Sequence, residues 1–254
     1  MQGTNLTKSL ILILFTSQYL FALISIEPVE IGQKAGIHGE LAISLETKRG
    51  NTQRDDYTAN TRITYDNNSS FVTWGEIASE YGKSNGVEDT KQTYLHLRHI
   101  HAITKERIRA ELFTQLEEDK FKLIKRRFLG GAGVRIKLFD ILDAGDGYLG
   151  LGAFYEGVNY TSTTDETEQN LRFNTYFAYT LKLSEDSKLS CTLYYQPKYD
   201  ELKEFVNTNK LNLELRIYKE LFLNLRVSYD TDSRPAIGVE KYDFYQQTSF
   251  VYKF

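Results

Sequence analysis

The sequence predicts an all-β protein: a closed antiparallel up-and-down transmembrane β-barrel of about 12 strands, following an N-terminal signal peptide. Three observations support this. Apolar and polar residues alternate through most of the chain, the alternating segments are mostly about 10 to 14 residues long, and the last of them ends on an aromatic residue, Phe254. Ordinary strands average about 5 to 6 residues, whereas a tilted strand that crosses a bilayer needs about 9 to 11. Segment length therefore favours a membrane barrel over a soluble sandwich.

The start of the chain has the character of an export signal. Lys8 is the only charge before the apolar run 10–15, and a cleavage site is expected after Ala22. A polar interruption follows the run, which argues against a spanning helix of about 20 apolar residues. An uncleaved anchor is the alternative. We expect three regions: a signal peptide over 1–22, a short lead over 23–35 and the barrel over 36–254.

The alternation tells which residues face lipid. It is plain in one segment, where polar residues separate Leu211, Leu213, Leu215 and Ile217. Most of the apolar sets contain no charged residue. Because a lysine or arginine facing lipid at the midplane costs about 2–4 kcal/mol, we expect the apolar set to face lipid and the polar set to face the interior. Near residue 71 the facing is open, since apolar residues occupy both faces: Val72 and Trp74 against Phe71 and Ile77. The segments are expected to start near residues 36, 56, 71, 91, 107, 126, 148, 169, 188, 208, 221 and 241.

The connections fit a barrel with both ends on the periplasmic side. Short turns are expected at 66–69 and 184–187, and longer, polar outer loops over 83–89, 161–168, 200–207 and 230–240. Bacterial outer-membrane barrels show this asymmetry. The segment 139–147 is an exception, because it predicts a long turn on the periplasmic side.

Composition excludes several classes of protein. The chain has 254 residues, a net charge of -3, and 18 Tyr and 15 Phe against 3 Pro. The mean hydropathy of -0.43 is too polar for a bundle of transmembrane helices. No basic excess points to a nucleic-acid partner. A single cysteine, Cys191, can form neither an internal disulfide nor a multi-cysteine metal site.

Several short motifs carry a family resemblance. The last strand alternates aromatic residues up to the terminus, and Phe250, Tyr252 and Phe254 resemble the C-terminal signal that the barrel-assembly machinery reads in bacterial outer-membrane proteins. With the segments 49–52, 127–135 and 233–243, this pattern resembles the salt-induced outer-membrane protein family, domain of unknown function 481. Arg49 stands where that family has serine. The resemblance implies an outer-membrane barrel in contact with membrane lipid and lipopolysaccharide, and it supplies no catalytic residues.

Candidate chemistry is sparse. His96, His99 and His101 cluster on one segment, but His99 and His101 are expected near the periplasmic end, away from the outer leaflet where a lipid-cleaving site would lie. The His-x-His spacing has no recognisable third metal ligand. The glycines of 130–133 have no following helix to form a phosphate cradle, so we expect them to bend a strand. We therefore predict no enzyme activity, no cofactor and no metal.

The polar set is the most informative feature for function. Its charged residues are expected to line the lumen: Arg62, Arg98, Arg109, Glu111, Arg135, Arg172, Glu214, Arg216 and Arg226. They could form a salt-bridged lattice that fills the interior, or a constriction that prefers anions. We predict a non-enzymatic, porin-like barrel of the cell envelope with a narrow, Arg-rich pore, connected to salt or osmotic stress by the family resemblance alone. The alternatives are a structural barrel with a plugged lumen and an outer-membrane lipid-modifying enzyme.

Overall fold

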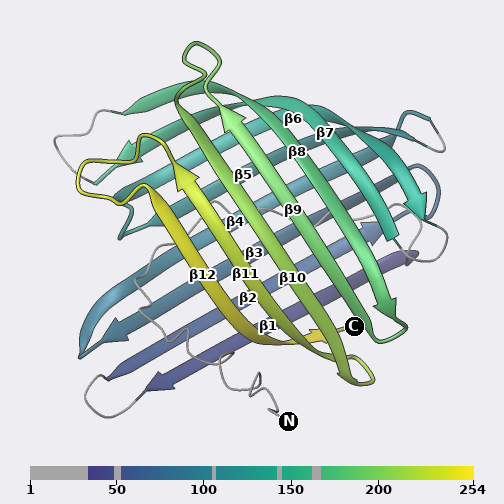
Figure 1. Ribbon diagram of the computed structural model, residues 1–254, viewed down its shortest axis with the longest axis horizontal. Coiled ribbons are helices and arrows are strands. Elements are labelled where there is room, and N and C mark those ends of the chain that lie inside the picture. The colour runs from purple at the N-terminus through teal and green to yellow at the C-terminus, as the bar shows by residue number, and fades with distance from the viewer. Residues whose placement is uncertain (1–33, 49–52, 105–106, 142–144, 162–166) are drawn as a thin grey trace, which may run out of the picture.

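Twelve strands in the described residues close into one antiparallel barrel in which each strand pairs with its neighbours in the chain and the last pairs with the first (Figure 1). The computed structural model describes residues 34–48, 53–104, 107–141, 145–161 and 167–254. The strands are β1 Gly36–Lys48, β2 Arg54–Asp66, β3 Phe71–Ser84, β4 Val87–Ala102, β5 Ile108–Asp119, β6 Ile124–Ile141, β7 Gly145–Tyr160, β8 Glu168–Ser184, β9 Ser187–Pro197, β10 Phe205–Tyr218, β11 Leu221–Asp232 and β12 Tyr242–Lys253. This confirms the predicted fold class. The predicted signal peptide, residues 23–33 of the lead and the 49–52 motif lie outside the described residues. No helix in the described part of the chain is long and apolar enough to cross a membrane.

The observed strands begin within four residues of the predicted starts, but the long turn predicted over 139–147 is wrong. β6 and β7 remain paired as far as Ile141 and Gly145, and Phe139 lies opposite Gly147. A Cβ atom on Gly147 would overlap the Phe139 ring, so the glycine leaves room for that ring. Glycine and aspartate suggested a turn, yet here they continue the ladder.

The two faces of the sheet have opposite character. Apolar side chains are exposed on the outward face of strands all around the barrel, among them Leu41, Ile63, Leu97, Phe128, Leu151, Phe173, Leu211 and Phe250. The inward positions carry most of the buried polar and charged residues. In β3, Val72 and Trp74 point inward and pack with Ile100, whereas Ile77 is exposed on the outside.

The barrel closes at a short seam between β1 and β12. Glu40–Ile43 pair with Phe250–Lys253, and Gly39 and Phe254 exchange two backbone hydrogen bonds of 2.9 Å. By contrast, β1 and β2 are paired over the full length of both strands. A Cβ atom on Gly39 would overlap the ring of Phe254, so the terminal ring covers the glycine. The terminal aromatic residue thus lies across the closing seam.

Candidate functional site

The interior divides into two parts of different construction. The inner faces of β4–β9 carry large aromatic and charged side chains in mutual contact; we call this part the filled half. The inner faces of β10–β12 and β1–β3 carry mostly small polar side chains around a cavity; we call this part the cavity half. Each half is built from inward-pointing residues, so the difference between them lies in side-chain size and pairing.

Glycines make room for the aromatic residues of the filled half. On β6 and β7 several inward positions are glycine. A Cβ atom on Gly150 would overlap the Tyr176 ring, and one on Gly131 would lie 2.6 Å from Cζ of Phe113. The rings of these aromatic residues therefore lie directly against the strands, in space that any larger residue would occupy.

A buried carboxylate joins the aromatic residues at the end of the filled half that lies toward the termini. The Tyr176 hydroxyl donates a hydrogen bond to Glu111 at 2.7 Å, and guanidinium nitrogens of Arg98 and Arg135 lie 3.7 and 3.6 Å from the same carboxylate. The Arg135 guanidinium also lies 4.6 Å from the centre of the Tyr148 ring, a cation–π arrangement. These charges are compensated within the protein.

A second network of charged side chains occupies the opposite end of the filled half. Glu156 accepts hydrogen bonds from Arg127, at 2.9 Å to Nε, and from Arg172. Arg172 in turn donates to Glu204 at 3.0 Å, and Arg234 donates to the other oxygen of Glu204 at 2.9 Å. Four charged side chains from β6, β7, β8 and the β9–β10 loop are thereby linked to the loop after β11.

The Arg234 end of this network lies outside the strands. Arg234 donates a hydrogen bond of 3.1 Å to Glu201 in the β9–β10 loop. This hydrogen bond and the negative charges of Glu201 and Glu204 raise the pKa of Arg234. The guanidinium therefore stays cationic and ties two loops together over the filled half.

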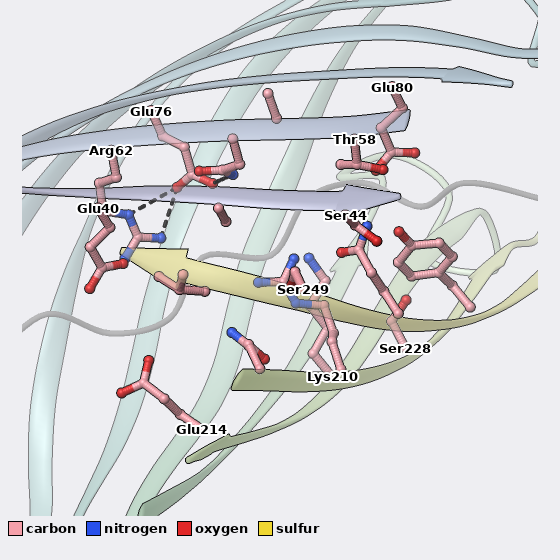
Figure 2. A pocket seen from close by; sticks show the side chains of 18 of the residues that line it. Glu40, Ser44, Thr58, Arg62, Glu76, Glu80, Lys210, Glu214, Ser228 and Ser249 are labelled. Atoms are coloured by element: carbon pink, nitrogen blue, oxygen red, sulfur yellow. Dashed lines mark hydrogen bonds and ion pairs between the residues drawn. The ribbon is translucent and has the colours of Figure 1, made fainter. Parts of the chain in front are cut away.

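The cavity half encloses about 1020 Å³ of space free of protein atoms, counting the part open to solvent. Figure 2 shows Glu80 and Thr58 on one wall, with Lys210 and Ser228 on the wall opposite. Most of the neutral lining residues are small or polar: Ala42, Ser44, Thr58, Asn60, Ala78, Gln92, Asn224, Ser228, Gln247 and Ser249. The charged lining residues are Glu40, Arg62, Glu76, Glu80, Lys210, Glu214 and Arg226.

Several of the cavity charges are paired. Arg62 donates to Glu76 at 2.8 Å, and Lys253 binds Glu214 at 2.7 Å. In Figure 2 the Arg62–Glu76 pair and Glu40 lie toward one end of the cavity, away from Glu80. The paired charges therefore concentrate at that end, which is the end near the seam.

A second pocket, the mouth, lies beyond the cavity at the end of the barrel away from the termini. Its lining residues include Lys122, Tyr160, Asp230, Asp232, Pro235, Ala236, Val239, Glu240, Lys241 and Asp243. The Asp119 carboxylate accepts hydrogen bonds of 3.0 Å from the backbone N–H groups of Phe121 and Lys122. This turn directs Lys122 across the mouth, where Nζ lies 3.6 Å from Asp243 on β12.

The family assignment rests on nearly the whole barrel. The model of the family described as protein of unknown function, DUF481, matches residues 41–254. The chain belongs to the DUF481 family. This confirms the predicted resemblance. No curated protein matches the chain significantly.

Solved structures similar to this DUF481 chain include an outer membrane channel and porins. An outer membrane channel from Pseudomonas putida F1 matches with a TM-score of 0.55 and 8% identity, over 90% of this chain and 97% of that chain. The NanC porin matches with a TM-score of 0.47 and 7% identity, over 86% and 98% of the two chains. A KdgM porin in complex with disordered oligogalacturonate matches with a TM-score of 0.44 and 10% identity, over 84% and 96%. At these identities, the first of them shows a shared fold.

The residues that the sequence assigned to the lumen fall into three groups in the DUF481 barrel. Five are buried in the filled half: Arg98, Arg109, Glu111, Arg135 and Arg172. Arg62, Glu214 and Arg226 line the cavity. Arg216 lies at a strand end, where Nε is 3.2 Å from Asp186 and about half of the side chain is exposed. The structure therefore brings three of the nine together around open space.

No histidine among the described residues lines the cavity or the mouth. His96 is fully buried on the inner face, near the rings of Trp74 and Tyr94. His99 has Nδ1 2.7 Å from the Thr73 hydroxyl and packs against Phe71. Within the described ranges, no group of three or more His, Cys, Asp or Glu residues could hold a metal ion.

Four residues that matter for the open space were not predicted: Glu80, Lys122, Lys210 and Tyr245. Glu80 shares the inward parity of Glu76, but the mixed pattern of β3 concealed it. Lys210 and Tyr245 share the parity of Asn212 and Gln247, which the alternation places inside. Lys122 reaches the mouth from a turn, and strand periodicity gives no signal for a turn residue.

Proposed function

We propose that this chain is a non-enzymatic β-barrel of the bacterial outer membrane with a narrow passage for small polar solutes along its cavity half. The observation that carries the proposal is the inverted polarity of the barrel. Exposed apolar side chains surround it, while charged side chains are buried within. Apolar surface of this extent is unfavourable in water and suits lipid, and a closed barrel leaves no unpaired edge strand exposed to lipid.

The cavity and the mouth follow one another along the same two strands. On β11, Ser228 lines the cavity and Asp230, the next inward residue, lines the mouth. On β12, Tyr245 and Asp243 have the same relation. Inward residues two apart stack along a strand. This continuity supports a passage that runs from the cavity to the far end of the barrel, narrowed by Tyr245 and Lys122.

The cavity is less basic than the Arg-rich lumen that the sequence predicted. Three basic residues line it, Arg62, Lys210 and Arg226, against four acidic residues, Glu40, Glu76, Glu80 and Glu214. Three of the seven predicted arginines, Arg98, Arg135 and Arg172, contact carboxylates in the filled half instead. A passage with this lining is expected to discriminate weakly between anions and cations.

Conductance of the refolded protein in a planar bilayer tests the passage. Wild type should show steps of small conductance, and Ala42→Trp, which places an indole in the cavity, should reduce them severalfold. Ala59→Trp is the matched control, because Ala59 is exposed on the outward face of the neighbouring strand. A silent wild type at high protein load, or equal conductance in the two variants, would contradict the passage.

A structural envelope barrel with a plugged lumen is the second candidate, and the filled half favours it. It predicts no conductance together with an envelope defect when the gene is deleted. The connection to salt or osmotic stress, the contact with lipopolysaccharide, and recognition of Phe250, Tyr252 and Phe254 by the assembly machinery stay predictions under either candidate. Loss of these three aromatic rings should lower the yield of folded barrel in cells.

A further inference from the structure

We infer that the cavity binds a small zwitterion, whose ammonium group lies at Glu80 and whose carboxylate lies at Arg226. The inference rests on the proposed passage and names the solute that it would select. Glu80 comes from β3 and Arg226 from β11, and both line the cavity. β2, β1 and β12 separate these strands in the barrel, so the two side chains approach the open space from different walls.

These two charges differ from the others in the cavity because neither is held in a direct ion pair or hydrogen bond. Among the described residues, the side chains of Glu80 and Arg226 form no hydrogen bond or ion pair. Among the other charged lining residues, Arg62 binds Glu76, and Glu40 and Glu214 both bind Lys253. Lys210 also interacts with other residues of the barrel. An unpaired charge in a partly enclosed space is costly, and a ligand group of opposite sign relieves that cost.

The Glu80 and Arg226 side chains open onto the same cavity. Among basic residues, Arg226 has the strongest electrostatic effect on Glu80, ahead of Lys210 and Lys122. Both Glu80 and Arg226 also act on Tyr245, which lines the cavity between β11 and the seam. A solute that carries both signs of charge can therefore approach both groups from within the cavity.

Neutral polar groups around the two charges complete the site. Thr58 lies beside Glu80 across the β2–β3 ladder, and Asn212 lies beside Arg226 across the β10–β11 ladder. The side-chain carbonyl oxygen of Asn224, a buried residue, accepts no hydrogen bond from a described residue. Such groups can bind the backbone-like atoms of an amino acid.

A zwitterion satisfies this arrangement better than a simple ion. An anion at Arg226 leaves Glu80 unpaired and is repelled by it, and a cation at Glu80 is repelled by Arg226. A molecule with an ammonium and a carboxylate group pairs both at once. Since one hydrogen bond to a charged group contributes about 1.5–3 kcal/mol, the preference should be at least about tenfold.

Saturation-transfer NMR titration of detergent-solubilised, folded full-length protein at pH 8 tests the site without relying on conductance. The probes are glycine, β-alanine and γ-aminobutyrate, which differ in charge separation, with acetate and methylammonium as single-charge halves. We expect one or more zwitterions to bind at least about tenfold more tightly than either half. Glu80→Gln and Arg226→Gln should each abolish this preference.

Matched controls lie outside the cavity. Glu118 and Arg126 form an exposed ion pair at 3.8 Å, so Glu118→Gln and Arg126→Gln remove the same charges without touching the site. Both should leave binding unchanged. Equal binding of zwitterions and their halves, no binding, or an unchanged preference in Glu80→Gln would overturn the inference. If the barrel conducts but does not prefer zwitterions over their halves, only the binding inference is rejected. If it binds zwitterions with this preference but shows no conductance, only the proposed passage is rejected.

Discussion

The filled half and the cavity half share one backbone architecture but differ in what their inward residues do. In the filled half, glycines such as Gly150 admit large rings such as Tyr176, and carboxylates such as Glu111 and Glu156 are surrounded by arginines. In the cavity half, inward positions are mostly small, as at Ala42 and Ser249. A twelve-stranded barrel lies between barrels filled by side chains and open porins.

The comparison teaches that an Arg-rich interior does not by itself make a pore. Arg135 has no exposed surface, and its guanidinium contacts Glu111 and the Tyr148 ring. Arg226, on the other wall, lines the open space. The same residue type stabilises the barrel in one half and is available to a solute in the other, so its role follows from its neighbours.

The largest loss of stability is expected from removing one charge of a buried ion-pair network in the filled half. Glu156→Gln removes the charge that Arg127 and Arg172 share. Removing one partner of a buried ion pair costs about 3–5 kcal/mol. Urea unfolding in micelles should show this loss in the free energy of unfolding. Glu118→Gln, at the exposed pair with Arg126, should cost about 0–1 kcal/mol. Equal costs would contradict the distinction.

A smaller loss of stability is expected from replacing an inward glycine that makes room for an aromatic ring. Gly150→Ala places a Cβ atom in the space of the Tyr176 ring, and overpacking of this kind costs about 1–3 kcal/mol. Gly157→Ala is the control on the same strand, because no atom lies within 4 Å of its added Cβ. Thermal unfolding, read from heat-modifiable migration on a gel, should separate the two variants. Identical midpoints would show that the ring does not need the glycine.

The smallest loss of stability is expected at the seam between β1 and β12. Gly39→Ala displaces the Phe254 ring, which lies at the flexible end of its side chain, so the cost should be on the order of 1 kcal/mol. Gly130→Ala, with its nearest neighbour at 3.9 Å, is the control. Refolding yield into lipid vesicles should fall for Gly39→Ala alone. If Gly130→Ala falls equally, the contact with the terminal ring is not the cause.

Periodicity in the sequence was sufficient to predict where the strands lie and, for most of them, which residues face inward. It could not separate the two halves of the interior, because parity tells which side of the sheet a residue occupies and nothing about what lies across the lumen. Arg109 and Arg135 were therefore expected to line the lumen together with Arg226, although both are buried in the filled half. The inward glycine Gly131 makes room for the Phe113 ring, whereas the glycines of 130–133 were interpreted from the sequence as bending a strand.

The central claim is that water and solutes reach one half of the interior and not the other. Two single-cysteine variants test it directly in a Cys191→Ser background: Ala42→Cys in the cavity half, and Ala178→Cys in the filled half, where Ala178 has no exposed surface. A charged, water-soluble thiol reagent applied to the folded barrel in vesicles should modify the Ala42→Cys variant rapidly. It should leave the Ala178→Cys variant unmodified until the barrel is unfolded. Equal protection of both variants would contradict an open cavity half, and equal reactivity would contradict a filled one.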